Sequence, residues 1–357
     1  MKVLYYGVHD DAYPRNSRIR GHLAERYGAR VVVVARSRRR GRLVRALDDA
    51  RGLWRGSRDV DVIVVSEMRS SHAPWAWLAS RLRGALLVVD CFIGLHETAV
   101  LDWGSVRPGS LRALRLRLLD RLAVRLADVA LSDTEPRAES LRRLGGSTPV
   151  VVLPVGAPAW ARDLPPTDPG GTLRVLYYGN YIPLHGTETV IEALEMTVPH
   201  RSVELTLIGG GPRRDGIRRL VDRSGLSASC RFVDPVPESD LRAAIAESDV
   251  VLGVFGDSAK ARSVVANKVW QGLACGRTVI TQRSTALDEL QVVAGARLVQ
   301  TEPGDASSVA AALVAFGRSD HRPTARTPGP VAPALEALVA RGYASLDAHL
   351  GAAGDRR

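Results

Sequence analysis

Residues 2–7 read Lys-Val-Leu-Tyr-Tyr-Gly, and the same Val-Leu-Tyr-Tyr-Gly returns at residues 175–179. Each copy is a short apolar run that ends in glycine, which is the form of a buried parallel strand turning into a loop. Between the copies, residues 154–158 and 164–171 are rich in proline and glycine, as a linker would be. The sequence therefore predicts two similar α/β units joined near residues 156–171.

Each half alternates apolar strands with segments of helical period, which favours two Rossmann-like, doubly wound domains with parallel sheets. We expect strands at residues 3–6, 30–35, 60–65, 85–90, 129–132 and 150–154, and then at 174–178, 204–208, 230–233, 250–254, 278–282 and 296–300. Expected helices include residues 186–195, 240–248 and 267–274. The predicted domains are residues 1–158 and 172–325, with a helical tail at 326–357 that packs back toward the first domain. Such sheets bind ligands beyond the carboxyl ends of their strands, so two facing domains would place their sites in the cleft between them.

Composition indicates a soluble cytoplasmic protein. Three widely spaced cysteines (Cys91, Cys230 and Cys275) favour reduced thiols, and none has the spacing of a metal ligand. The chain opens directly on a strand-like stretch, and no apolar run reaches the roughly 18 residues that span a bilayer.

The net charge of +11 comes almost entirely from arginine, because only Lys2, Lys260 and Lys268 are lysine. This skew is typical of a GC-rich genome, so it does not by itself indicate nucleic acid as a partner. A retained lysine can mark a site that needs a compact ammonium group, although chance explains three lysines equally well.

Two segments of the second half could bind a phosphate. The loop of Gly209, Gly210 and Gly211 follows a strand and precedes a helix, where backbone amides can approach an anion; a simple glycine-rich turn is the alternative. Residues 256–268 form a polar loop with Lys260, Arg262 and Lys268, and a helix is expected to begin near Asn267 as its N-cap. Cations at a helix N-terminus beyond a strand would hold a diphosphate.

The order of these segments resembles that of the retaining glycosyltransferases of family 4 (glycosyl transferases group 1), which have the GT-B fold. The resemblance rests on NKVWQGLACGRTVIT at residues 267–281, ALDEL at 286–290, VLYYGNYIPLHGTETVIEAL at 175–194, LTLIGGGP at 205–212 and DRLAVRLADVALSDTE at 120–135. It covers nearly the whole chain. It implies transfer of a sugar from a nucleoside diphosphate to an acceptor hydroxyl of a polysaccharide, a lipid-linked compound or a natural product. It further implies retained anomeric configuration, no metal and no cofactor beyond the nucleotide-sugar co-substrate.

The chain departs from the family pattern at the donor site. Many members carry two glutamates here, for the donor sugar and the ribose, and the aligned positions are Ser263 and Gln271. The diphosphate-binding Arg and Lys of the family fall on Asn180 and His185, after Gly179. We therefore expect Lys260 and Lys268 to supply the cations and Gln271 to bind a ribose hydroxyl. Glu289, in the ALDEL segment, completes the expected donor-binding residues.

In the first half, Asp90 ends a strand and His96 follows in the next loop. Family members use a polar residue or histidine in this loop near the reacting sugar, so we take Asp90 and His96 as candidate catalytic residues. A carboxylate that ends a buried strand needs a partner. For His96, an ordinary loop position is an equal alternative. Asp10, Asp11, Arg15 and Arg18 are expected to contact the acceptor or phosphates, unless the loop is merely solvated.

Three other patterns in the sequence do not indicate a functional site. The Asp59-Val60-Asp61 sequence has the Asp-x-Asp form of a metal motif but lies at the wrong end of its strand, and the histidines lack the spacing of a hydrolase triad. The arginine-rich residues 36–42 lack interleaved aromatics, so we expect no nucleic acid.

Leucines at 111, 114, 118, 122 and 126 form a helical stripe beside arginines at 117, 121 and 125. One interpretation is a helix packed on the core. The other is peripheral contact of helix 111–126 with an anionic inner membrane face.

Three functions remain open from the sequence: a glycosyltransferase, a catalytically silent GT-B partner or binding subunit, and a GT-B sugar-nucleotide epimerase. The glycosyltransferase is the leading hypothesis, and the missing glutamates and phosphate cations are the reason for keeping the second. The few acidic residues at 255–285 disfavour the third.

Overall fold

The computed structural model describes residues 1–10, 13–38, 40–167, 171–316 and 330–354. It divides into two compact units, Met1–Val155 with Val339–Arg357, and Gly156–Leu338. The expected boundary at residues 325–326 lies outside the described residues, as does Asp11. Residues 156–167 of the expected linker form no helix or strand, and they pack on the second unit, where Leu164 N donates to Cys275 O at 3.2 Å.

The first unit is a six-stranded parallel sheet in the order β2-β1-β3-β4-β5-β6. Its strands are β1 (Lys2–Val8), β2 (Arg30–Ala35), β3 (Val62–Val65), β4 (Leu86–Asp90), β5 (Val129–Ser132) and β6 (Val150–Val152). Its helices are α1 (Pro14–Tyr27), α2 (Arg42–Gly56), η1 (Ser70–His72), α3 (Ala73–Arg83), η2 (Glu97–Asp102), α4 (Leu111–Leu126) and α5 (Glu135–Gly145). Aliphatic side chains of the strands and of α3 form its core.

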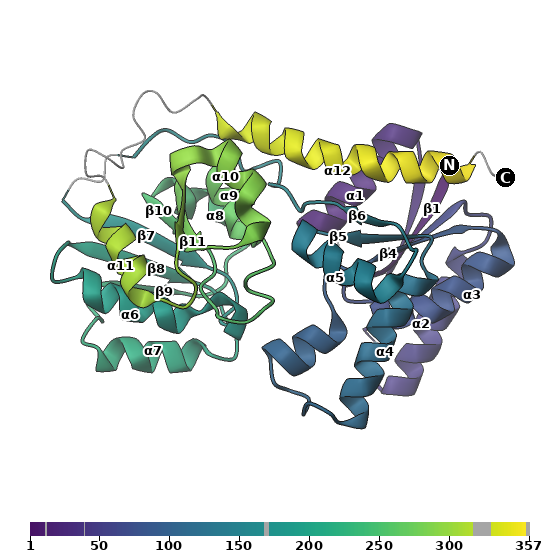
Figure 1. Cartoon of the computed structure of the whole chain (residues 1–357), viewed down its shortest axis with the longest axis horizontal. Coiled ribbons are helices and arrows are strands. Elements are labelled where there is room, and N and C mark those ends of the chain that lie inside the picture. Colours follow the sequence, from purple (N-terminus) through teal and green to yellow (C-terminus); the bar gives the residue numbers. More distant parts are fainter. Residues whose placement is uncertain (11–12, 39, 168–170, 317–329, 355–357) are drawn as a thin grey trace. The chain divides into compact units, whose positions relative to one another are not determined.

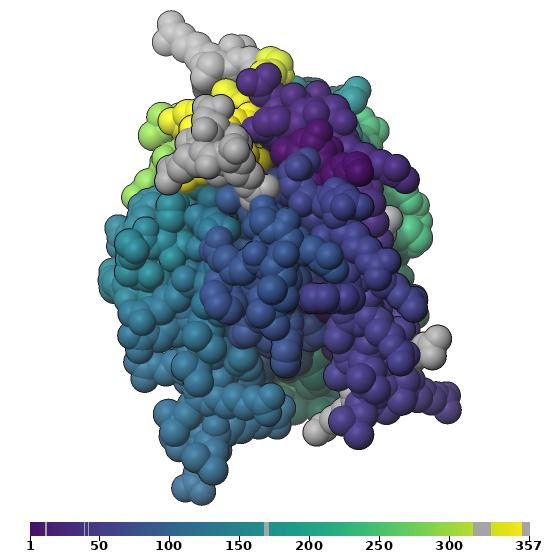
Figure 2. Space-filling view, turned by 90° about the vertical axis from the view of Figure 1, so that its right-hand side faces the viewer, coloured from purple at the N-terminus to yellow at the C-terminus, as the bar shows by residue number. Residues whose placement is uncertain are grey.

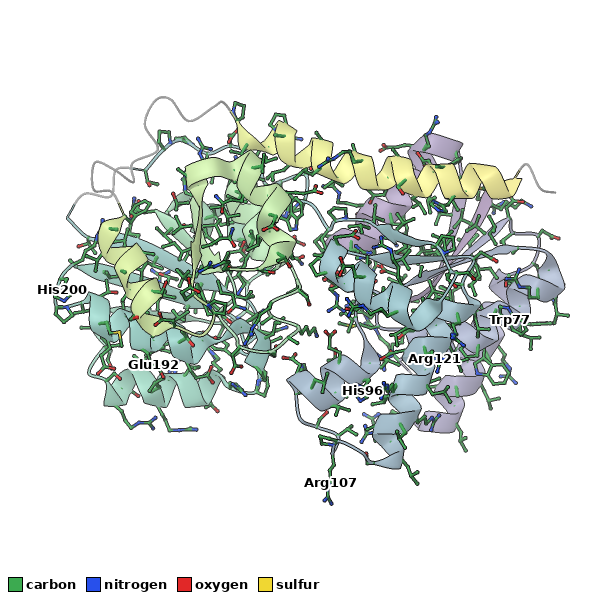
Figure 3. All side chains as sticks on the ribbon, viewed as in Figure 1. Trp77, His96, Arg107, Arg121, Glu192 and His200 are labelled. Carbon is green, nitrogen blue, oxygen red and sulfur yellow. The ribbon has the colours of Figure 1, made fainter. Side chains whose placement is uncertain are left out.

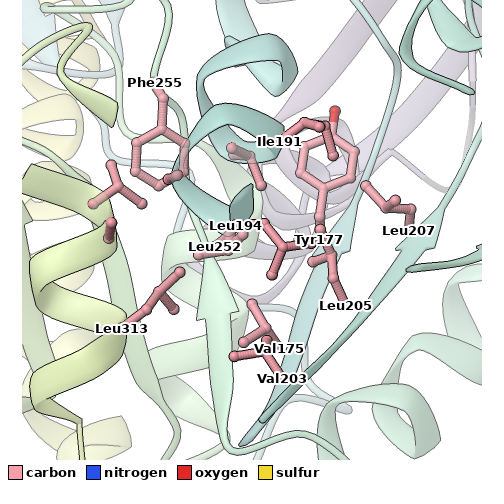
Figure 4. Packing of buried hydrophobic residues seen from close by; sticks show 14 of the residues in the cluster. Val175, Tyr177, Ile191, Leu194, Val203, Leu205, Leu207, Leu252, Phe255 and Leu313 are labelled. Carbon is pink, nitrogen blue, oxygen red and sulfur yellow. The ribbon is translucent and has the colours of Figure 1, made fainter. Parts of the chain in front are cut away.

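The second unit repeats this plan, with the sheet order β12-β11-β10-β7-β8-β9. Its strands are β7 (Leu173–Tyr178), β8 (Val203–Ile208), β9 (Cys230–Val233), β10 (Val250–Leu252), β11 (Thr278–Gln282) and β12 (Leu298–Thr301). Its helices are η3 (Pro183–His185), α6 (Thr187–Thr197), α7 (Arg214–Arg223), α8 (Glu238–Ala246), α9 (Asn267–Ala274), η4 (Thr285–Leu287), α10 (Asp288–Ala294), η5 (Gly295–Arg297) and α11 (Ala306–Ala315). Figure 4 shows the core of this unit, in which Tyr177 and Phe255 pack among aliphatic side chains.

The last helix, α12 (Val331–Gly354), begins in the second unit and ends in the first (Figure 1). Its later residues pack on α1. The rings of His22 and Tyr343 stack at 4.2 Å between centroids, and His22 Nε2 and the Tyr27 hydroxyl each lie 2.8 Å from Asp347 Oδ1. No helix in the described part of the chain has the length and apolar character needed to cross a membrane.

The expected strands and helices are present, with three instructive differences. Strand β10 ends at Leu252 rather than at residue 254, because the next loop turns away and the amides of Phe255 and Gly256 donate to His185 O and Leu184 O at 3.0 and 3.3 Å. Strand β6 stops two residues before Pro154, which has no N–H for the ladder. Helix α9 has the predicted bounds, but its N-cap is Ala266, so the prediction that Asn267 caps the helix is wrong.

Candidate functional site

In both units the first strand lies where the strand order reverses. Strand β1 has β2 on one side and β3 on the other, and β7 has β8 and β10. In open parallel sheets this switch point, at the carboxyl ends of the strands, is the preferred place for a ligand. A glycine of positive φ lies near the carboxyl end of each first strand: Gly7, at +85°, is the last but one residue of β1, and Gly179, at +133°, follows β7. The repeated sequence therefore leads, in each unit, into the loop of greatest functional interest.

In the second unit, two loops meet at the switch point through their backbones. A Cβ on Gly186 would overlap the backbone of Phe255 and Gly256, and one on Gly256 would lie 2.6 Å from the carbonyl oxygens of Pro183 and Leu184. Only glycine allows this approach. As a result, the loop after β7, which carries His185, is held against the loop after β10, which leads to Lys260 and Lys268.

Lys268 is the central charge of this switch point. It is 4% exposed, and its Nζ lies 4.1 Å from the centroid of the Tyr177 ring, a cation–π contact. A Cβ on Gly179 would be 3.6 Å from the same Nζ. This ammonium has no hydrogen-bond partner among the described residues, and burial lowers its pKa from 10.5 to about 7. A buried, unsatisfied cation beside a loop of open backbone is a site prepared for an anion.

His185 is held beside Lys268. Its Nδ1 lies 3.0 Å from the Tyr177 hydroxyl and is also hydrogen-bonded with Asn180 O. Burial and the charge of Lys268, with a smaller effect of Lys260, hold the pKa of His185 well below its usual range. A neutral imidazole therefore occupies the position where the resembling family has a cation, and the positive charge here comes from the two lysines. Lys260 is 9% exposed, in the turn before α9.

Gln271 lies one turn after Lys268 on α9 and is buried. Its Oε1 accepts from the Tyr178 hydroxyl at 2.7 Å, and its Nε2 donates to Glu238 Oε1 at 3.2 Å. Glu238, in the first turn of α8, was missed by the sequence reasoning. No local pattern marks this contact, because it joins residues 33 positions apart.

The remaining residues that were expected to bind the donor are either in backbone contacts within the fold or exposed at its surface. The Gly209 amide donates to Val233 O at 3.1 Å, and Gly210 O accepts from Tyr181 N at 2.8 Å, so the glycine loop packs on the loop after β7. A Cβ on Gly211 would lie 2.7 Å from Tyr181 N. Arg262 is exposed, and its guanidinium donates to Asp257 O at 2.8 Å. Asn267 begins α9, and Glu289 is exposed in the first turn of α10.

In the first unit, Asp90 has the partner that its burial requires. Arg15 donates from Nε to Asp90 Oδ2 at 2.7 Å and from Nη2 to Oδ1 at 3.0 Å, and both side chains are fully buried. The expectation that Arg15 contacts an acceptor or phosphate is wrong in this structure, because its guanidinium also donates to the carbonyls of Leu153 and Ser132. Asp90 therefore shapes the carboxyl edge of the sheet from a buried position.

His96, labelled in Figure 3, is the N-cap residue of η2. Its loop is clamped by hydrogen bonds from two sides. Asp120 of α4 accepts from the amides of Leu95 and His96 at 2.9 and 2.8 Å. Arg137 of α5 donates to Glu97 Oε2 at 2.9 Å and to Phe92 O at 3.0 Å. Neither clamp was predicted, because both join elements far apart in the sequence.

A second pair at the β1–β3 switch point was also missed. His9 Nδ1 lies 2.8 Å from Oε1 of the fully buried Glu67, which also accepts from Asn16 Nδ2 at 3.0 Å. Glu67 Oε2 is buried without a hydrogen-bond partner in the described structure, and burial, with the charge of Asp90, raises the pKa of Glu67. No sequence motif marks this pair, because strand order alone brings the ends of β1 and β3 together.

The fold and these two edges define a two-domain α/β protein of the GT-B class. Two family models match the chain: the glycosyl transferase 4-like domain over residues 7–156 and glycosyl transferases group 1 over residues 172–317. Together they cover most of the sequence, and the chain belongs to the group 1 glycosyltransferases.

Several solved structures share the fold of this chain. Alr3699/HepE of Anabaena, solved with UDP and glucose, is 17% identical over 96% of this chain and 95% of its own, with a TM-score of 0.67. Sucrose-phosphate synthase of Thermosynechococcus elongatus is 16% identical over 99% and 100%, with a TM-score of 0.70. A Listeria monocytogenes protein described as a UDP-N-acetylglucosamine 2-epimerase is 15% identical over 93% and 92%, with a TM-score of 0.54. At such identities the likeness establishes the fold alone. No curated protein matches the sequence.

Proposed function

We propose that this glycosyltransferase binds a nucleoside-diphosphate sugar at the switch point of its second unit and transfers the sugar, with retained configuration, to an acceptor hydroxyl. The observation that carries the proposal is the buried Lys268 ammonium, unsatisfied by hydrogen bonds and adjacent to Gly179. A diphosphate would give this cation the counter-charge that the described residues do not. Lys260 adds a second positive charge close enough to affect His185.

The ribose is assigned to the neighbouring turn of α9. Gln271 replaces the glutamate that many family members have, and Glu238 brings a carboxylate within 3.2 Å of its amide nitrogen. We propose that Glu238 and Gln271 together receive the ribose hydroxyls. The complexes of HepE with UDP, with UDP and glucose, and with UDP-glucose support a UDP-sugar as the first donor to test.

Catalysis in this proposal is mainly electrostatic. The donor's own diphosphate takes up the acceptor proton, and the two lysines stabilise the negative charge that builds on the leaving phosphate. Asp90 and His96 of the first unit stay in this proposal as candidate catalytic residues, with Asp90 held by Arg15 and His96 fixed by the Asp120 clamp. The reaction needs no metal or further cofactor in this proposal. Within the described residues, no group of three or more His, Cys, Asp or Glu side chains could hold a metal ion. The proposed compartment is the cytoplasm.

The proposal is tested by calorimetric titration of the full chain with UDP-, GDP- and dTDP-sugars, with and without EDTA. We expect one donor to bind equally in both conditions. Lys268→Ala should weaken binding of that donor by about ten- to a hundredfold, the value of one charge-assisted contact, and should barely change binding of the free nucleoside. Loss of binding with EDTA, or equal losses for nucleoside and nucleotide, would contradict the proposed site.

The stereochemical course is tested separately, by the anomeric coupling constant of the product in NMR. An axial donor should give an axial product. An inverted product would contradict the retaining mechanism, and donor binding without turnover on any acceptor would favour a silent binding subunit.

A further inference from the structure

The first three leucines of the stripe on α4 do not pack on the core. Leu111 is 86% exposed, and Leu114 and Leu118 are each 55% exposed, whereas Leu122 and Leu126 are half-buried. The helix itself packs on the core, as one interpretation of the sequence held, but it does so through Ala123 and Val124. The residues of α4 that are buried are small or β-branched ones, such as Ala113, Ala123 and Val124. An exposed stripe at positions i, i+3 and i+7 is an apolar side of the helix that none of the described residues covers.

Exposed apolar side chains also form stripes on the two neighbouring helices, α3 and α2. On α3, the exposed apolar residues are Trp75, Leu78 and Leu82, again at i, i+3 and i+7. On α2, Leu43, Leu47 and Trp54 are exposed, at i, i+4 and i+11. The loop between η2 and α4 adds Leu101 and Trp103, which are 62% and 51% exposed. By contrast, the described residues of the second unit expose only three large apolar side chains, Met196, Val198 and Val292.

These stripes belong to one layer. Strands β2, β3, β4 and β5 are joined in order by α2, α3 and α4, and right-handed crossovers in one direction place such helices on one face of a parallel sheet. Helix α3 packs against both α2 and α4, and Figure 1 shows the three beneath the sheet of the first unit. Figure 2 shows residues of this region, violet to blue, on the surface toward the viewer. We call the exposed side chains of α2, α3, α4 and residues 101–110 the outer helical face.

The charge on the outer helical face has one sign. Exposed arginines accompany every stripe, and Arg83 of α3 lies 4.8 Å over the Trp54 ring of α2. Arg107, at the tip of the loop before α4, extends away from the unit (Figure 3). Within α2, α3, α4 and residues 101–110, no described acidic side chain is exposed: Asp49 and Asp102 are buried, and Asp48 and Asp120 are half-buried. Helix α5, which packs on α4, has two exposed glutamates, Glu135 and Glu139, and each forms an ion pair with an arginine of α5 itself.

We propose that the outer helical face docks on an anionic lipid membrane, an interaction that goes beyond the transfer reaction. Leucines and tryptophans on a helix surface bury themselves at the boundary of headgroups and acyl chains. Arginines beside them extend to the lipid phosphates while their methylenes stay in apolar contact. Three adjacent stripes present this combination over a broad surface.

The uniform charge of the outer helical face favours an anionic membrane over a second copy of this protein as the binding partner. A second copy that docked through the same face would bring two arginine sets together without any exposed carboxylate to neutralise them, which opposes a symmetric dimer. An anionic bilayer supplies both requirements of the face at once, an apolar interior and a negative surface.

The test is sedimentation of the full chain with vesicles of equal parts phosphatidylcholine and phosphatidylglycerol, and with vesicles of phosphatidylcholine alone. We expect binding to the anionic vesicles that weakens steeply as salt is added, and little binding to the neutral ones. Removal of both charges in Arg115→Gln/Arg121→Gln should weaken partition by about twenty-five-fold, since each basic residue contributes about fivefold. Leu114→Ser/Leu118→Ser should weaken it by about tenfold or more per leucine.

Matched controls lie on the second unit. Arg219→Gln/Arg223→Gln removes two exposed arginines of α7, and Val292→Ser removes an apolar side chain that is 86% exposed. Neither should change vesicle binding, and all variants should keep the far-ultraviolet circular dichroism and the nucleotide-sugar affinity of the parent.

Equal losses in the control variants, or binding to neutral vesicles as strong as to anionic ones, would overturn the proposal. So would failure of the parent chain to bind anionic vesicles, or light scattering that shows a dimer broken by Leu114→Ser/Leu118→Ser. Vesicle binding without any nucleotide binding would leave this face intact and contradict the donor site instead.

Discussion

At the scale of the residue, Lys268 links burial to proton binding. Its pKa of about 7 in the folded protein, against an ordinary 10.5, means that the unfolded chain holds a proton between these pH values that the folded chain releases. The buried ammonium therefore lowers the free energy of unfolding by its full amount below pH 7, and this destabilisation disappears as the pH rises toward 10.5. A bound diphosphate would raise the pKa of Lys268 again, because its negative charge favours the ammonium form.

The affinity for a nucleotide sugar should therefore depend on pH through Lys268. From pH 7 to about pH 9 it should fall by up to tenfold per pH unit, because each binding event takes up one proton. Lys268→Met should bind weakly, without this dependence, and should fold at least as stably, because it removes an unsatisfied buried charge. Calorimetry at several pH values measures both chains. A parent and a variant with parallel pH profiles would contradict the assignment of the proton to Lys268.

At the scale of the element, the backbone contact of Gly186 with the loop after β10 holds the donor loops together. Gly186→Ala should lower the free energy of unfolding by about 3 kcal/mol, because the new Cβ would overlap backbone that has nowhere to move. Gly225→Ala is the matched control: Gly225 also has positive φ, at +67°, but a Cβ there meets nothing within 4 Å. Gly225→Ala should lower the free energy of unfolding by only about 1 kcal/mol, which is the energy that an alanine loses in the left-handed conformation. Equal losses in chemical denaturation would show that the contact does not matter.

The clamp on His96 is an element-scale feature with a functional readout. Asp120→Asn keeps the size of the side chain but weakens the hydrogen bonds from the Leu95 and His96 amides. We expect faster hydrogen exchange at residues 94–98 and, once a donor and acceptor are known, a lower kcat with little change in the donor KM. Exchange that stays unchanged in this segment would contradict the clamp.

The sequence predicted the elements better than their contacts. The bounds of α4, α9, β2, β5, β9 and β11 agree with the expected ranges, because turn residues and apolar period mark them locally. Whether the leucines of α4 meet a core could not be read from their period, since an amphipathic helix has the same pattern with or without a partner. The His9–Glu67 and Gln271–Glu238 pairs depend on which strands and helices become neighbours, and no local pattern encodes that order.

At the scale of the whole molecule, each unit is a version of the same plan, and the first is completed by residues from the end of the chain. Asp347→Ala removes the partner of His22 and Tyr27 on α1. This substitution should lower the free energy of unfolding by about 1–2 kcal/mol. It should also raise the rate of hydrogen exchange in α1 without changing the rate in the second unit, which serves as an internal control. A uniform rise in both units would contradict the assignment of these residues to the first.

The position of α12 also orders events during synthesis. Gly342 packs where a side chain would lie 2.7 Å from Val152 O, and the first unit includes Val339–Arg357. The amino-terminal unit emerges from the ribosome first, yet its last helix is translated after the entire second unit. The second unit can complete its fold while the first still waits for its final segment. On the nascent chain, the first unit would thus stay incomplete until α12 is translated, and the apolar surface that α12 covers would stay exposed until then.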